Sequence, residues 1–291
     1  SKRRTITTRF SALDSHALPV VMAIVNRTPD SFYDRGATFT DEAALRRCDE
    51  VVAAGAAIVD IGGVKAGPGS LVDAAEEIDR VVPLIAAVAA RYPGVLISVD
   101  TWRAEVAEEA IRAGAGLIND TWAGHDPELA EVAGHHRVGY VCSHTGGSEP
   151  RTRPHRVHFD DVVADVIAET TRLAERAVAA GVPEERIFID PTHDFGKNTF
   201  HGLELLRRVD ELVATGWPVL MALSNKDFVG ETVNREVGGR VAGTLAATAW
   251  AAARGVAAFR AREGAETVDV IRMPAAIAGT AAPLNTIRGL V

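Results

Sequence analysis

Acidic, amide and cationic side chains stand at the ends of several short apolar runs in this 291-residue sequence. Asp100, Asn119 and Asp190 offer hydrogen-bond acceptors and one amide donor, and Lys226 offers a cationic donor. Such a set suits a flat heterocycle that carries amide and amino groups, such as a pterin. A single Asp or Asn at a strand end is equally well explained as a turn former or a helix cap. The prediction therefore depends on many strand ends converging on one place.

The elements that must position these residues are apolar, β-branched runs that alternate with Ala-rich segments of helical periodicity. Strands are expected at residues 20–25, 57–62, 95–100, 116–120, 138–143, 186–190, 218–223 and 256–261. Helices are expected near residues 41–54, 73–91, 103–113, 127–134, 161–180, 203–214, 237–253 and 265–278. This alternation predicts an α/β fold of parallel strands joined by crossover helices, a (β/α)8 TIM barrel.

We expect residues 19–291 to form a single barrel domain and residues 1–18 to form an N-terminal arm. In a (β/α)8 barrel the active site is built at the carboxyl ends of the strands and in the loops that follow them. Those ends carry Asn26, Asp60, Asp100, Asn119, Asp120, Ser143, His144, Asp190, Ser224, Asn225, Lys226, Arg260 and Arg262. The polar side chains are therefore expected to meet at one barrel mouth.

Charge and cysteine content exclude several classes of partner. The chain has 39 acidic and 31 basic residues, and its formal net charge of -8 disfavours binding to nucleic acid or to an anionic membrane surface. The basic start SKRRTITTRF is followed by no apolar h-region of a signal peptide, and no apolar run approaches the ~18–20 residues of a membrane span. Cys48 and Cys142 offer no disulfide framework, which indicates a reducing compartment. We therefore expect a cytoplasmic protein.

Seven segments of the chain resemble one known family, in the family's order. They are MAIVNRTPDSFYDRG (22–36), DIGGVKAGPG (60–69), SVDTWRAEVAEEA (98–110), INDTW (118–122), DPTHDFGK (190–197), LSNKDFVG (223–230) and FRAREG (259–264). Together they resemble the dihydropteroate synthase family over nearly the whole chain. The family is a (β/α)8 barrel, usually a homodimer. It condenses 6-hydroxymethyl-7,8-dihydropterin diphosphate with p-aminobenzoate in folate synthesis.

The resemblance implies a retained pterin pocket. Asp100, Asn119, Asp190 and Lys226 match the family's pterin-binding residues, and among them Asp100, Asp190 and Lys226 are the expected catalytic residues. Phe195 matches an aromatic residue of the family, and Ser224 and Arg260 are further expected substrate-binding residues. Asn26 matches the asparagine associated with Mg2+ and diphosphate, so Mg2+ is the expected cofactor if diphosphate is bound.

Other positions depart from the family's pattern. Where the loop after the second strand approximately reads DIGGESTRPG in the family, Val64, Lys65, Ala66 and Gly67 replace Glu, Ser, Thr and Arg. The missing Thr and Arg belong to the loop that closes over p-aminobenzoate and the diphosphate. Three further substitutions fall at the expected mouth: Asn225 replaces an arginine, Arg262 replaces a histidine and Arg27 replaces a small aliphatic residue. Thr192, His193 and Asp194 occupy a loop that is rich in glycine in the family.

Two explanations of these departures compete. Relaxed selection scatters substitutions across the site of a paralogue that is losing the reaction. Re-specialisation instead uses Arg27, Lys65 and Arg262 as substrate-binding cations in a rebuilt anion pocket. Because the changes spare the pterin side, we expect a pterin-binding protein with weak or no synthase activity.

The alternatives are an active synthase, a re-specialised pterin- or anion-dependent transferase, a methyltetrahydrofolate-type methyltransferase and a non-catalytic binding subunit.

The small residues of the helix expected near 237–253 suit close packing between helices. Because the family that the chain resembles is usually homodimeric, these residues predict a homodimer.

Overall fold

The structure, a computed structural model, describes residues 18–28, 41–147, 149–151 and 158–289. The strands found in these ranges are β1 (Val20–Asn26), β2 (Ile58–Gly62), β3 (Leu96–Asp100), β4 (Leu117–Asp120), β5 (Gly139–Cys142), β6 (Ile187–Ile189), β7 (Leu220–Ala222) and β8 (Ala258–Ala261). They pair in parallel in the order β6-β5-β4-β3-β2-β1-β8-β7. A parallel bridge between Ile189 and Val219 joins the two ends of that order. The predicted (β/α)8 barrel is confirmed.

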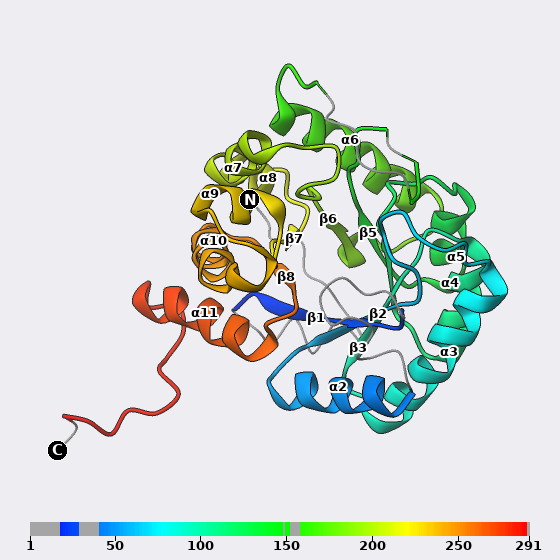
Figure 1. Cartoon of the computed structure of the whole chain (residues 1–291), viewed down its shortest axis with the longest axis horizontal. Coiled ribbons are helices and arrows are strands. Elements are labelled where there is room, and N and C mark those ends of the chain that lie inside the picture. The colour runs from blue at the N-terminus through cyan, green and yellow to red at the C-terminus, as the bar shows by residue number, and fades with distance from the viewer. Residues whose placement is uncertain (1–17, 29–40, 148, 152–157, 290–291) are drawn as a thin grey trace.

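Helices surround the barrel on its outside (Figure 1). Those that follow the first five strands are α2 (Asp41–Ala53), α3 (Ala74–Arg91), α4 (Ala104–Ala113), α5 (Glu128–His136) and α6 (Val162–Ala179). The later ones are α7 (Thr199–Arg207), α8 (Val209–Ala214), α9 (Asp227–Val233), α10 (Val241–Ala253) and α11 (Gly264–Ile277). No helix in the described ranges is long and apolar enough to cross a membrane.

Three helical predictions differ from the structure. The helix expected at 203–214 is divided at Arg208, whose φ of -105° and ψ of 26° end α7 and precede α8. The helix expected from residue 237 begins at Val241, after a short 3-10 turn at Val237–Gly239. The short helix α9 was not predicted. The expected arm over residues 1–18 lies outside the described residues except for residue 18.

The alternation of side chains along each strand forms both the apolar core of the barrel and a polar layer nearer the mouth. Each strand sends an apolar side chain into the barrel interior: Met22, Ile58, Leu96, Leu117, Val141, Phe188, Leu220 and Ala258. Because side chains alternate between the two faces of a strand, the residue two positions later also faces inward, one layer nearer the mouth. Those positions include Asp60, Ser98, Asn119, Ser143, Asp190 and Arg260. A polar layer therefore lies directly on the apolar core.

Candidate functional site

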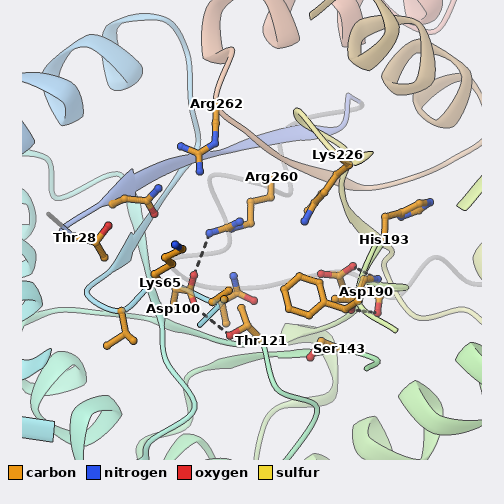
Figure 2. Close-up of a pocket in the computed structure, with 18 residues that line it drawn as sticks. Thr28, Lys65, Asp100, Thr121, Ser143, Asp190, His193, Lys226, Arg260 and Arg262 are labelled. Atoms are coloured by element: carbon orange, nitrogen blue, oxygen red, sulfur yellow. Dashed lines mark hydrogen bonds and ion pairs between the residues drawn. The ribbon is translucent and has the colours of Figure 1, made fainter. Parts of the chain in front are cut away.

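A cavity of about 260 Å³ opens at the carboxyl ends of the strands (Figure 2). Of the residues expected at the site, its lining includes Asn26, Lys65, Asp100, Asn119, Asp190, Phe195, Lys226, Arg260 and Arg262. Thr28, Thr121, Ser143, Thr192 and His193 also contribute to the lining. The structure thus brings together side chains from the ends of strands that are far apart in the sequence.

The floor of the cavity is organised by Asp60, which is fully buried. One of its carboxylate oxygens accepts a hydrogen bond from Ser98 Oγ at 2.6 Å. The other accepts from Asn119 Nδ2 at 3.2 Å and from Arg260 Nε at 2.7 Å. A buried carboxylate is stable only when its charge is paired and its lone pairs are used. Asp60 therefore fixes the orientation of both Asn119 and Arg260.

Arg260 links this floor to Asp100. Its Nη2 donates to Asp100 Oδ2 at 3.0 Å, and Thr121 Oγ1 donates to Asp100 Oδ1 at 3.2 Å. Burial raises the pKa of Asp100 above its ordinary value, while the guanidinium of Arg260 opposes the shift. The Asp100 carboxylate is held in one orientation at the cavity wall.

Asp190 and Lys226 form the opposite side of the cavity (Figure 2), and Phe195 lies beside Lys226 in its lining. Asp190 accepts from the backbone N–H of Thr192 at 2.7 Å, and burial raises the pKa of its carboxyl group to about 6. Burial lowers the pKa of the Lys226 ammonium. The Lys226 nitrogen lies 5.2 Å from the centroid of the Phe195 ring, within the range of a cation–π contact. This side offers an acceptor, a cationic donor and an aromatic ring to a planar ligand.

Asp194 joins the loop after β6 to the helix that follows Lys226. Its carboxylate accepts from the backbone N–H groups of Asp227 and Phe228, in the first turn of α9. The loop itself is held by Lys197, whose Nζ donates to the carbonyls of His144, Thr192 and Phe195 at 3.1, 3.1 and 2.9 Å. Burial lowers the pKa of Lys197 to about 7. The position of Lys226 is thus coupled to a neighbouring loop.

His193 serves packing in this loop. Its ring is fully buried, with its centroid 4.9 Å from that of Phe228. Its Nε2 lies 3.3 Å from the carbonyl oxygen of Gly202. Burial lowers its pKa to about 3, which keeps the imidazole neutral at pH 7. It therefore carries no charge to a ligand.

Three residues expected at the site do not line the cavity: Arg27, Ser224 and Asn225. Arg27 donates from Nε to the Arg80 carbonyl at 3.0 Å and forms an ion pair with Asp41 at 2.5 Å. Because Asn26 faces the mouth, the alternation of side chains directs Arg27 to the other side of its strand.

Ser224 and Asn225 join neighbouring loops instead, Ser224 through its hydroxyl and Asn225 through its backbone. Ser224 Oγ accepts from the backbone N–H of Arg262 at 3.3 Å and donates to Glu263. Asn225 has a φ of 63°, a left-handed conformation that asparagine adopts more readily than arginine. Its backbone N–H donates to Thr244 Oγ1 at 3.2 Å and its carbonyl accepts from Arg240 at 3.1 Å. Neither side chain reaches the cavity lining.

The sequence and fold agree with one family of known proteins. A family model described as pterin binding enzyme matches residues 22–262. The chain is 61% identical over 275 residues to a Mycobacterium leprae protein named inactive dihydropteroate synthase 2, covering 93% of this chain and 94% of that protein. This chain belongs to the dihydropteroate synthase family.

Relatives within the dihydropteroate synthase family differ in their degree of similarity. The dihydropteroate synthase of Streptococcus pyogenes is 36% identical over 255 residues, covering 86% of this chain and 92% of that protein. A Xanthomonas albilineans dihydropteroate synthase solved with 4-aminobenzoic acid has a TM-score of 0.82 and 39% identity, covering 92% of this chain and 95% of that one. The chain is thus more similar to the protein named inactive than to these two synthases.

The loop that follows β2 in this chain is held by arginines from neighbouring loops. Arg103 donates to the carbonyl of Val72 at 2.7 Å and to Glu77 at 2.8 Å. Arg151 donates to the carbonyls of Gly67 and Ser70 at 3.3 and 2.6 Å. The loop is therefore tethered through its backbone, at a place where the family's own Thr and Arg are absent.

Sequence reasoning missed the roles of Asp60, Asp194 and Lys197. Asp60 had a visible signal, because a charged residue inside an otherwise apolar, buried strand requires a partner. Asp194 accepts from backbone N–H groups that lie more than thirty residues away in the sequence. Lys197 donates to carbonyl groups of irregular loops. Their hydrogen bonds become evident only in three dimensions.

Proposed function

We propose that this protein binds a pterin at the barrel mouth and has weak or no ability to condense 6-hydroxymethyl-7,8-dihydropterin diphosphate with p-aminobenzoate. The observation that carries the proposal is an asymmetry within one cavity. Asn119, Asp100, Asp190 and Lys226 keep the family's residue types. Asn119 and Asp100 are joined through Asp60 and Arg260, and Asp190 accepts from the backbone N–H of Thr192. The β2 loop, on the other side, has lost the family's hydroxyl and guanidinium.

The ring-binding side supplies what a pterin requires. A pterin edge alternates N–H donors with acceptors, and the Asp190 carboxylate can accept from an amino group and a ring N–H. Asn119 supplies both an acceptor and a donor, while Lys226 supplies donors. Phe195, held edge-on by Trp122 at a centroid distance of 5.5 Å, provides an apolar surface. Because these groups are already oriented, little ordering entropy opposes binding.

The weak or absent condensation follows from the β2 loop. In the family the Thr and Arg of this loop help to hold the leaving diphosphate and the arylamine together. Ala66 and Gly67 have neither a hydroxyl nor a guanidinium. Lys65 lines the cavity but presents a point charge, which does not reproduce the planar fork of an arginine. Misplaced reactants and a lost charge-stabilising donor each cost about two orders of magnitude in rate.

Calorimetry with 6-hydroxymethylpterin tests the pterin-binding half of the proposal. Asp190→Ala should weaken binding by about 1–3 kcal/mol, because it removes a buried acceptor from the ligand. Asp210→Ala changes an exposed aspartate of α8 and should leave the affinity unchanged. Equal affinities of Asp190→Ala and the parent, or no binding by the parent at millimolar ligand, would contradict the proposal.

We further propose a homodimer that assembles through α9 and α10. An apolar groove of about 350 Å³ is lined by residues of α7, α9 and α10. Val233 and Trp250 on its rim are 43% and 44% exposed. Apolar surface of this kind is typical of protein interfaces. Sedimentation at micromolar protein should give about twice the monomer mass; a monomer would contradict this proposal.

The compartment that suits this function is the cytoplasm. Cys48 and Cys142 are both buried and unbonded to each other. Free thiols of this kind are typical of a reducing environment. Expression with a compartment-specific tag tests this proposal, and an oxidised, exported form would contradict it.

A further inference from the structure

Thr192 continues the pairing of β5 with β6 beyond the point where the two strands end. The backbone N–H of Asp190 donates to the carbonyl of Cys142 at 2.8 Å, and Pro191, which follows, has no N–H to donate. The Thr192 hydroxyl then accepts from the backbone N–H of His144 at 2.9 Å, on the β5 side. Because His144 is fully buried, its N–H depends on a protein acceptor such as this hydroxyl.

The same threonine holds Asp190 at two points. Its backbone N–H donates to the Asp190 carboxylate at 2.7 Å, and its hydroxyl donates to the Asp190 carbonyl at 3.1 Å. The carbonyl of Thr192 accepts from Lys197 Nζ at 3.1 Å and from the backbone N–H of Phe195 at 3.3 Å. Thr192 therefore connects the carboxylate in the cavity wall with the β5 loop and with the aromatic residue of the lining.

The backbone at Thr192 is left-handed, with a φ of 57°. This conformation is an outlier for a β-branched residue, whereas glycine adopts it without steric cost. The family's loop at this place is rich in glycine, so this chain has a strained residue in a loop that glycine would suit. Strained residues persist where the surrounding contacts hold them, and they are concentrated at binding sites. The two contacts of the hydroxyl, with His144 and with Asp190, are ones that glycine does not supply.

We propose that Thr192 is a positioning residue of the pterin pocket, whose hydroxyl uses the β5 loop as a support to fix the Asp190 carboxylate in the orientation that accepts from the pterin edge. The inference rests on the proposed pterin-binding function. It adds a residue that acts on the ligand through Asp190.

The ionisation of Asp190 reports this orientation. Burial raises the pKa of its carboxyl group to about 6, and the backbone N–H of Thr192 opposes the shift. The cations that act on the carboxylate, Lys226, Lys197 and Arg260, oppose it as well. An N–H that donates to an ionised carboxylate stabilises the charged form, so a loss of orientation weakens this hydrogen bond and raises the pKa further. A threonine that only packs in the loop would leave the pKa unchanged.

Calorimetry with 6-hydroxymethylpterin on the full-length protein, from pH 5 to pH 8, tests the proposal. Thr192→Val keeps the branched shape and removes the hydroxyl. Its affinity at pH 8 should be about threefold to tenfold lower than that of the parent, because buried hydrogen bonds are lost. The pH below which its affinity declines should also be about half a pH unit higher. Thr192→Ser keeps the hydroxyl and should retain the parent's affinity and pH profile.

Two further variants separate positioning from folding. Thr192→Gly removes the hydroxyl together with the backbone strain, so it should fold even if the valine variant does not. It should show the same loss of affinity and the same shift in pH. Thr199→Val removes the hydrogen bond from a threonine of α7 to Glu231 at 2.5 Å, outside the cavity lining. This control should keep the affinity and the pH profile of the parent.

Parental affinity in both Thr192→Val and Thr192→Gly would overturn the inference and leave the pterin proposal standing. A loss of affinity without a shift in the pH profile would do the same, because it would show a structural role only. A serine variant as weak as the valine variant would also overturn the inference, since the hydroxyl would then not be the acting group. Failure of the parent to bind the pterin would overturn both the inference and the proposed function.

Discussion

Arg260 at the end of β8 donates to Asp100 at the end of β3, with an Nη2 to Oδ2 distance of 3.0 Å across the barrel mouth. In the order of the sheet, β1 and β2 separate these two strands. The same guanidinium also binds Asp60 on β2. One arginine therefore joins three strand ends and neutralises the carboxylates at the floor of the cavity.

Removing this arginine should destabilise the fold. Arg260→Ala leaves the buried Asp60 carboxylate without its cation, and breaking a buried pair from one side costs about 3–5 kcal/mol of unfolding free energy. Urea denaturation measures the loss. Arg112→Ala, which removes exposed ion pairs to Glu108 and Glu109, should cost less than about 1 kcal/mol. Equal losses for the two variants would refute the role assigned to Arg260.

Pterin affinity should decrease on acidification. A pterin that donates to Asp190 favours the ionised carboxylate, and the pKa of this group in the free protein is raised to about 6. Below that pH the affinity should fall by about tenfold per pH unit, because Asp190 must release one proton on binding. Asp190→Asn should abolish this dependence in titrations from pH 5 to pH 8. Tighter binding by the parent in acid would contradict the assignment.

The cap that Asp194 supplies to α9 should control the position of Lys226. Asp194→Ala removes the acceptor of the Asp227 and Phe228 N–H groups, with a loss of about 1 kcal/mol of stability. It should also weaken pterin binding, because Lys226 directly precedes the uncapped turn. Asp161→Ala removes the cap of α6, which accepts from Ala164 N at 3.0 Å. That control should lose stability while keeping its pterin affinity; a loss of affinity in both variants would indicate a general effect.

Most of the barrel, and the position of Asp100, Asn119 and Asp190 in the cavity wall, were predictable because both follow from short-range regularities. The alternation of β-branched runs with helical segments fixes the fold class, and the period of two then places Asp100, Asn119 and Asp190 at the mouth. The same period indicates that Arg27, next to the inward-facing Asn26, points away from the cavity. Arg27 therefore pairs with Arg80 and Asp41 and does not line the cavity in which it was expected.

The remaining errors concern tertiary interactions. Helix α9 is seven residues long, and its first N–H groups are capped by Asp194 from another loop. The sequence next to α9 does not include the capping residue, so local sequence does not predict this helix start. Asn225 was expected at the mouth in place of the family's arginine, yet its left-handed backbone and its contacts with Thr244 and Arg240 account for it as a loop residue. Such roles depend on contacts that no sequence window includes.

The rate of dihydropteroate formation from 6-hydroxymethyl-7,8-dihydropterin diphosphate and p-aminobenzoate decides whether the changed β2 loop weakens the condensation. It should be measured on the parent and on a variant that carries Glu, Ser, Thr and Arg at positions 64 to 67. The parent should be slower than a family synthase by at least about two orders of magnitude, and the variant should recover part of the difference. Vigorous synthesis by the unmodified protein would contradict the account.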